Sequence, residues 1–169
     1  FDAVCVCNGH YSAPAFPNLP GLTPYFRGRT MHSIHYDDPA DFAGQTVLCI
    51  GGRASGADLA REIAPHATHV YLSDTIPPVV DDDDNKDNDD SPFVTKYNVT
   101  WVPKTEGVLP DGSIQLDSTV VNGMKVKAPP IAGVDVIIFC TGYDYSFPFC
   151  NVNSNLEFAA PVGARRVTP

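Results

Sequence analysis

The chain has 169 residues, of which 43% are hydrophobic, and a formal net charge of -9. The apolar content suffices for one core, so a single domain is the first expectation. The acidic balance disfavours nucleic acid and anionic lipid as partners, because both require a basic face. With no apolar run near the roughly 18 residues of a membrane helix and no visible signal peptide, we expect no transmembrane segment and a cytoplasmic location.

The five cysteines support that location. They form no C-x-x-C pair, and most of them lie in apolar runs. This distribution is typical of buried thiols in a reducing, intracellular compartment.

The first half of the chain predicts a βαβ unit. Asp2–Asn8 contains a short apolar run that indicates a buried strand, and a long Pro- and Gly-rich connection follows it. Thr46–Ile50 predicts the second strand, Ala54–Ile63 an amphipathic helix, and His69–Leu72 the third strand. This order implies parallel strands with a right-handed crossover.

Asp81–Asp90 is an acidic insertion after the βαβ unit. It holds seven Asp and one Lys, and therefore carries -6 of the net charge of -9. Such a run is typical of a solvated loop. A calcium loop is the alternative, but the run has neither the Gly at loop position six nor the terminal Glu that such a loop uses.

Short strands follow the insertion. Val99–Val102 and Gly107–Leu109 are the first two, and the pairs Asp111-Gly112 and Asn122-Gly123 then predict hairpin turns, because these residue types tolerate positive φ. Val134–Phe139 is apolar throughout, which predicts a last strand that is buried on both faces.

The residues between the second strand and the helix are typical of a dinucleotide turn. Such a turn uses one glycine for the tight bend, a second for the approach of the pyrophosphate, and a third for close packing of helix on strand. Arg53 replaces the second glycine, and its side chain either pairs with a phosphate or blocks the ligand; a turn that binds nothing is the third possibility. The predicted cofactor-binding residues of this turn are Gly51, Gly52, Arg53, Ala54, Ser55 and Gly56.

Ser73 and Asp74 follow the third strand, at the tip that contacts a ribose in this type of fold. An acid at this position hydrogen-bonds a 2′-hydroxyl and repels a 2′-phosphate, which favours NADH over NADPH if a nucleotide binds. Arg53 could offset that preference, and a solvated turn residue is the alternative role for Asp74.

No residue group predicts a metal site or a catalytic residue. His32 and His35 have H-x-x-H spacing, but no third ligand accompanies them, and a hydrogen-bonded structural role suits His32 better than zinc. No Ser/His/Asp or Cys/His arrangement stands out.

Four motifs, in order and at suitable spacing, resemble those of the flavin-containing monooxygenase family. They are Phe26-x-Gly28-x-x-x-His32-x-x-x-Tyr36, the upstream segment Asn8-Gly9-His10-Tyr11, the turn region Val47–Asp58, and Phe139-Cys140-Thr141-Gly142-Tyr143, in which Cys140 replaces the family's Ala.

The resemblance implies an α/β fold in which a Rossmann-type NAD(P)-binding domain carries an inserted antiparallel β-meander. We expect this domain at residues 46–138, a remnant of an FAD domain with the connecting segment at 1–45, and a return segment to the FAD domain at 139–169. Thr141 and Gly142 are predicted to contact cofactor where the chain returns. In the family, NADPH reduces FAD, and the reduced flavin activates O2 for transfer to a small-molecule nitrogen or sulfur nucleophile.

The sequence also departs from the family pattern, because the family's separate glycine-rich FAD turn is not found. We therefore expect a fragment of such an oxidoreductase that retains NADPH or NADH binding, weakened by Arg53, and that is inactive alone. The alternative is a non-catalytic or degenerate nucleotide-binding or interaction module.

Overall fold

A computed structural model describes residues 7, 9–75, 94–121, 124–146 and 167–168. Most of the predicted strand Asp2–Asn8, the acidic insertion Asp81–Asp90 and the turn at 122–123 lie outside the described residues. The chain falls into two compact units, one formed by Pro17–Cys140 and the other by Phe1–Phe16 together with Thr141–Pro169.

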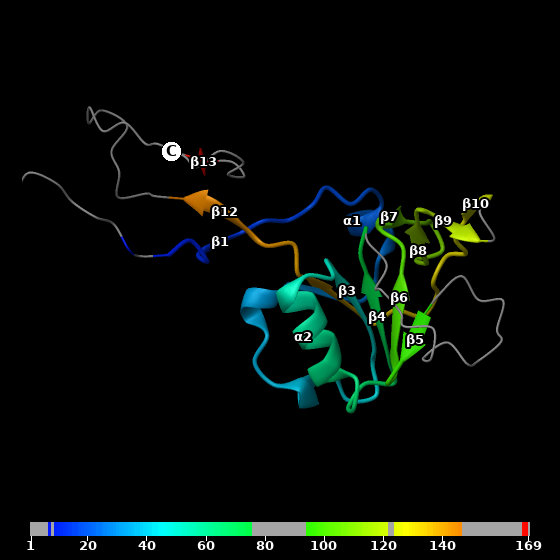
Figure 1. Cartoon of the computed structure of the whole chain (residues 1–169), viewed down its shortest axis with the longest axis horizontal. Helices are drawn as coiled ribbons and strands as arrows, with labels where there is room; N and C mark the ends of the chain where they lie inside the picture. The colour runs from blue at the N-terminus through cyan, green and yellow to red at the C-terminus, as the bar shows by residue number, and fades with distance from the viewer. Residues whose placement is uncertain (1–6, 8, 76–93, 122–123, 147–166, 169) are drawn as a thin grey trace, which may run out of the picture. The chain divides into compact units, whose positions relative to one another are not determined.

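The larger unit is built on a six-stranded sheet with the order β2-β11-β3-β4-β6-β5 (Figure 1). Only the β5–β6 pair is antiparallel; the neighbours from β2 to β6 run parallel. The strands are β2 (Arg29–His32), β3 (Thr46–Ile50), β4 (His69–Ser73), β5 (Val94–Lys96), β6 (Val99–Val102) and β11 (Val136–Phe139). This mixed sheet and its helix confirm the predicted α/β fold class.

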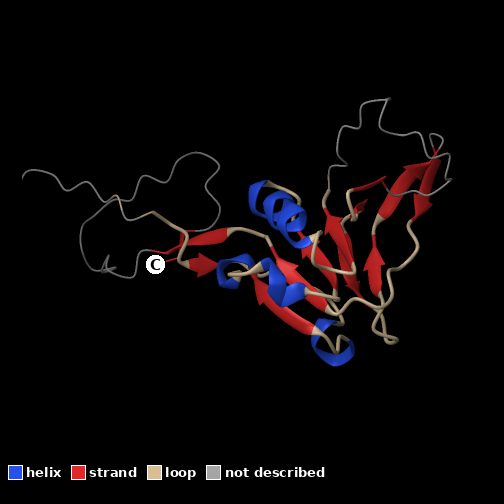
Figure 2. Ribbon diagram, turned by 90° about the horizontal axis from the view of Figure 1, so that it is seen from below, coloured by secondary structure: helices blue, strands red, loops and turns tan. Residues whose placement is uncertain are grey.

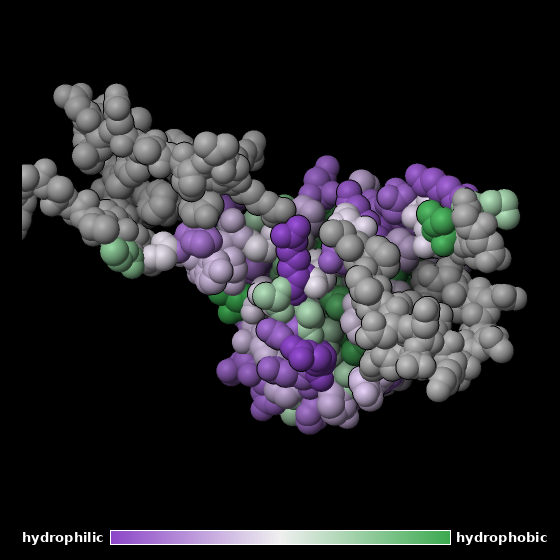
Figure 3. Space-filling model, viewed as in Figure 1, coloured by the Kyte–Doolittle hydropathy of each residue, from purple (hydrophilic) through white to green (hydrophobic). Residues whose placement is uncertain are grey.

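The predicted βαβ unit is present at the centre of this sheet. Helix α2 spans Ala54–Ile63 and crosses from β3 to β4, which pair in parallel. Gly56, Ala60 and Ile63 are buried at the spacing of one helical face, whereas Asp58 and Arg61 are exposed. The exposed face of α2 is hydrophilic (Figure 3).

The sheet separates two apolar cores, because its central strands bury alternate residues on opposite faces. Val47 and Cys49 of β3 pack toward α2 and the 3-10 helix η2 (Pro39–Phe42), whereas Leu48 and Ile50 pack on the other side. That second side is covered by the hairpin of β7 (Thr105–Val108) and β8 (Ile114–Leu116), together with α1 (Leu22–Tyr25). Figure 2 shows helices on both sides of the sheet.

Two features of the larger unit differ from the expected pattern. The long connection before β3 contains β2, which adds a parallel strand beside β11, and the 3-10 helix η1 (Ser33–His35). The antiparallel part consists of two separate hairpins, β7–β8 and β9–β10, which share no ladder. In the second hairpin, β9 (Ser118–Val121) and β10 (Met124–Lys127) carry exposed apolar side chains (Figure 3).

The described residues of the smaller unit form three short strands. They are β1 (Ala13–Pro14), β12 (Tyr143–Ser146) and β13 (Val167–Thr168), and β12 lies between the other two. The rings of Tyr11 and Tyr143 stack with their centroids 4.8 Å apart. Across the described part of the chain, no helix combines the length and hydropathy needed to span a membrane.

Candidate functional site

The turn between β3 and α2 is tight enough to require glycine at two positions. Gly51 has a φ of 104°, and an added Cβ would lie 2.6 Å from the carbonyl oxygen of Cys140. Its N–H donates to the carbonyl of Ser73 at 2.9 Å, which ties the turn to β4. A Cβ on Gly56 would lie 1.8 Å from the carbonyl oxygen of Gly51, so only glycine lets the helix begin this close to the strand.

The N-terminus of α2 presents backbone donors that no side chain satisfies. Arg53 is its N-cap residue, with φ -78° and ψ -166°, and it forms no capping hydrogen bond. The N–H groups of Ala54, Ser55 and Gly56 have no acceptor among the residues that the structure describes. Such N–H groups, at the positive end of a helix dipole, form the usual binding site for a phosphate.

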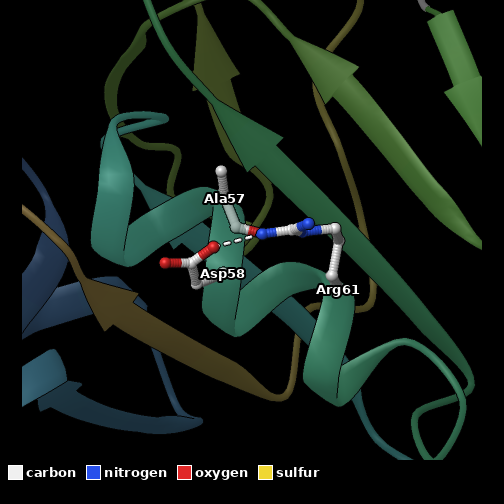
Figure 4. Close-up of polar contacts among 3 residues, drawn as sticks. All are labelled: Ala57, Asp58 and Arg61. Atoms are coloured by element: carbon white, nitrogen blue, oxygen red, sulfur yellow. Dashed lines mark hydrogen bonds and ion pairs between the residues drawn. The ribbon is translucent and has the colours of Figure 1, made fainter.

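The two arginines of this helical segment differ in their partners. Arg61 forms an ion pair with Asp58, and its Nε donates to the carbonyl of Ala57 at 3.4 Å (Figure 4). Arg53 is exposed and pairs with no carboxylate of the described residues. Arg53 is therefore the cation beside the turn that remains available to an anion.

Gly52 makes room for the Asp74 carboxylate, a contact that sequence reasoning did not reveal. A Cβ on Gly52 would lie 2.6 Å from Oδ2 of Asp74 and 2.8 Å from its Cβ. The backbone holds Asp74 in place, because its N–H donates to the carbonyl of Val102 at 3.2 Å and its Oδ1 accepts from the N–H of Thr75 at 2.6 Å. The acid at the tip of β4 thus lies against the glycine turn.

Ser73 lies beside Asp74, but its side chain is buried, with 2% of its surface exposed. Its hydroxyl donates to the carbonyl of Pro103 at 3.1 Å and accepts from the N–H and the hydroxyl of Thr105 at 2.8 and 2.9 Å. The Ser73 hydroxyl therefore joins β4 to β7, and its backbone carbonyl is the group that contacts the turn.

The last two predicted site residues belong to the smaller unit. Thr141 donates its hydroxyl to the carbonyl of Ala15 at 2.5 Å, and the carbonyl of Gly142 accepts from the N–H of Ala15 at 3.0 Å. Both residues fasten the segment after β1 to the start of β12. Their predicted contact with cofactor stays a prediction.

The motif at 26–36 reaches the interior of the larger unit at two positions, Phe26 and His32, whereas most of its other residues are exposed. Phe26 is in the core, and a Cβ on Gly28 would lie 2.2 Å from the carbonyl oxygen of Asp135. His32 is fully buried, and its Nδ1 accepts from the N–H of Ile34 at 3.2 Å, which caps η1. Among the described residues, no group of three His, Cys, Asp or Glu is placed to hold a metal ion.

Tyr36, the last residue of that motif, fastens it to the crossover helix. Its hydroxyl donates to Oε2 of Glu62 at 2.9 Å, and its ring stacks on Phe42 with the centroids 6.0 Å apart. Partial burial, together with the hydrogen bond and the negative charge of Glu62, raises the pKa of Tyr36 to about 12. The motif therefore supports α2 and, through it, the glycine turn.

The family model described as flavin-binding monooxygenase-like matches residues 1–81. Flavin-containing monooxygenase FMO GS-OX5 of Arabidopsis thaliana is 37% identical over 153 residues, which cover 90% of this chain and 29% of that protein. Flavin-containing monooxygenase iboF of Amanita muscaria (strain Koide BX008) is 35% identical over 159 residues, which cover 88% of this chain and 28% of that protein.

A solved structure gives the same result in three dimensions. S-allyl-L-cysteine S-oxygenase from Allium sativum has 35% sequence identity and a TM-score of 0.63, with 90% of this chain and 30% of that chain covered. The chain thus spans less than a third of the length of each of these three proteins.

Proposed function

Because this chain belongs to the flavin-containing monooxygenase family, we propose that its β3–α2 turn binds the pyrophosphate of a nicotinamide nucleotide. One observation carries the proposal: three backbone donors at the start of α2 and the Asp74 carboxylate border the same glycine turn. The donors suit a pyrophosphate, and the carboxylate suits the hydroxyls of the adjoining ribose.

Each group of the turn has a distinct part in this proposal. The N–H groups of 54–56 donate to phosphate oxygens, and Gly51 and Gly56 keep the backbone close enough for them to do so. The exposed Arg53 side chain is free to swing aside, and it contributes a charge-assisted contact. We therefore propose that Arg53 pairs with the nucleotide, in contrast to the expectation that it weakens binding.

We propose that the whole protein is an oxygenase for small molecules with a soft nitrogen or sulfur centre, using O2 and a nicotinamide nucleotide. Bound FAD supplies the chemistry that activates oxygen. In this proposal, residues 46–138 orient the nucleotide, residues 1–45 and 139–169 contribute to the flavin side, and the protein is cytoplasmic. The 169 residues by themselves bind nucleotide without turnover.

The second candidate is a nucleotide-binding or interaction module without catalysis. The observation that favours it is Arg53, which stands where the turn's second glycine would allow the closest approach of the pyrophosphate. Under this reading, a nucleotide binds but transfers no hydride.

Calorimetric titration with NADH and NADPH tests the proposal. We expect at least one of them to bind, and Arg53→Ala to weaken that binding about three- to tenfold, because an exposed charge pair contributes modestly. Arg61→Ala is the matched control, because the Arg61 guanidinium is held by Asp58, and it should leave affinity unchanged. No binding of either nucleotide would refute the proposed function, and tighter binding by Arg53→Ala would show that this side chain blocks the turn.

A further inference from the structure

We propose that Asp74 selects a nucleotide with a free 2′-hydroxyl on its adenosine ribose, so that this site takes NADH in preference to NADPH. The inference rests on the proposed function of the turn and adds a choice of ligand to it. It depends on how the carboxylate is held and on which donors surround it.

The carboxylate has one anchored oxygen and one open oxygen. Oδ1 accepts hydrogen bonds from the N–H and the hydroxyl of Thr75, at 2.6 and 3.2 Å. Oδ2 faces Gly52, and among the described residues it has no hydrogen-bond partner and no cation. Oδ2 is therefore an acceptor beside the glycine turn, where a ribose hydroxyl can donate to it.

Among the residues that the structure describes, the side chains around Asp74 offer little to a 2′-phosphate, which would need donors or a cation at this tip. The hydroxyl of Ser73 already donates to Pro103, and the hydroxyl of Thr75 donates to Asp74 itself. Arg61 is paired with Asp58, and Arg53, at the N-cap of α2, makes no ion pair with Asp74. A phosphate dianion would thus meet the carboxylate without a compensating partner from the described residues.

The glycine at 52 supports the same assignment. Any side chain there would collide with the Asp74 Cβ as well as its Oδ2, so a residue with a Cβ would push the carboxylate away from the turn. Gly52 therefore keeps this acid in contact with the turn. The alternative is that Asp74 only stabilises the bend after β4 through its hydrogen bonds to Thr75. In that case its contact with Gly52 would not affect ligand binding.

The experiment measures the dissociation constants of NADH and NADPH, and of ADP-ribose and its 2′-phosphate, for the full chain and for Asp74→Ser. We expect wild type to bind the ligands without a 2′-phosphate at least about tenfold more tightly, and Asp74→Ser to reduce that ratio to about twofold or less. Asp37→Ser removes an exposed carboxylate with no described hydrogen bond and should keep the wild-type ratio. Circular dichroism establishes that each variant is folded.

The outcomes separate this inference from the proposed function. The proposed role of Asp74 would be overturned if wild type bound NADPH as tightly as NADH or more tightly. It would also be overturned if Asp74→Ser left the ratio of the dissociation constants unchanged; in both cases nucleotide binding itself would stand. If none of the four ligands binds to wild type, both the proposed function and this inference are wrong.

Discussion

The glycine turn at 51–56 and the motif at 26–36 are both recognisable in the sequence, but they differ in whether their polar groups have partners within the chain. The turn leaves backbone donors, a guanidinium and one carboxylate oxygen without partners among the described residues. In the motif, His32 caps a 3-10 helix and Tyr36 donates to Glu62. Phe26 is buried in the core, and Gly28 packs closely against the backbone of Asp135. A motif that marks a family is therefore not by itself a ligand site; the groups left unsatisfied are the better guide.

The largest expected effect that tests this contrast is a loss of stability in the motif. Gly28→Ala would place a Cβ 2.2 Å from the carbonyl oxygen of Asp135 and 2.7 Å from the ring of Phe26. We expect the free energy of unfolding to fall by about 2–3 kcal/mol, measured by urea denaturation, because overpacking forces the backbone to shift.

Gly133→Ala is the control for that loss. Gly133 has open space around it and a φ of 73°, so the substitution adds only left-handed strain of about 1 kcal/mol. Equal losses in the two variants would contradict the steric role of Gly28. If the folded Gly28→Ala variant changed the ratio of the NADH and NADPH dissociation constants, the motif would contribute to ligand binding and the contrast with the turn would be wrong.

A smaller effect on folding is expected at the turn, together with a loss of binding. Gly52→Ala would place a Cβ 2.6 Å from Oδ2 and 2.8 Å from the Cβ of Asp74, so the carboxylate and the backbone that carries it both have to shift. We expect NADH affinity to fall about tenfold, measured by calorimetry, and the free energy of unfolding to fall by about 1 kcal/mol. A large loss of stability with unchanged NADH affinity would show that Gly52 has a structural role and no role in binding.

The smallest effect concerns Tyr36. Tyr36→Phe removes a hydrogen bond to an exposed carboxylate, and we expect it to cost about 0.5 kcal/mol at neutral pH, measured by urea denaturation.

The pH dependence of that cost gives a sharper test. The pKa of Tyr36 is raised from 10.0 to about 12 in the folded chain, so its contribution is fully present below pH 10 and is lost as the pH rises toward about 12. Wild type and Tyr36→Phe should therefore converge in stability across that range. A constant difference would show that neither burial nor the Glu62 contact raises the pKa of Tyr36. The absorbance of ionised tyrosine would follow the titration directly.

The parts of the fold with strong local patterns were predictable. The bounds of β3 and α2 match their predicted ranges, because a strand that is apolar after its first residue and is followed by an amphipathic helix leaves little ambiguity. Strand β2 was missed, because Arg29–His32 shows no alternation and becomes a strand only by pairing with β11, far along the chain.

The candidate site was predictable only in outline. Sequence spacing placed Asp74 at the tip of a strand, but the contact with Gly52 depends on the fold of two loops. Ser73 illustrates the reverse, because its position suggested a ligand contact, whereas its hydroxyl bonds to the segment around Thr105. Local sequence does not reveal which of two adjacent polar residues the core will take up.

Two buried thiols lie beneath the glycine turn. Cys49 is wholly buried, and Cys140 lies close enough that its Cβ would be 3.3 Å from a Cβ on Gly56. The hydrogen bond with Cys140, together with burial, raises the pKa of the Cys49 thiol well above its usual value, so the folded chain protects it from alkylating reagents. The rate at which Cys49 becomes alkylated therefore reports how often the sheet under the turn opens locally. Mass spectrometry can measure this rate without an introduced label.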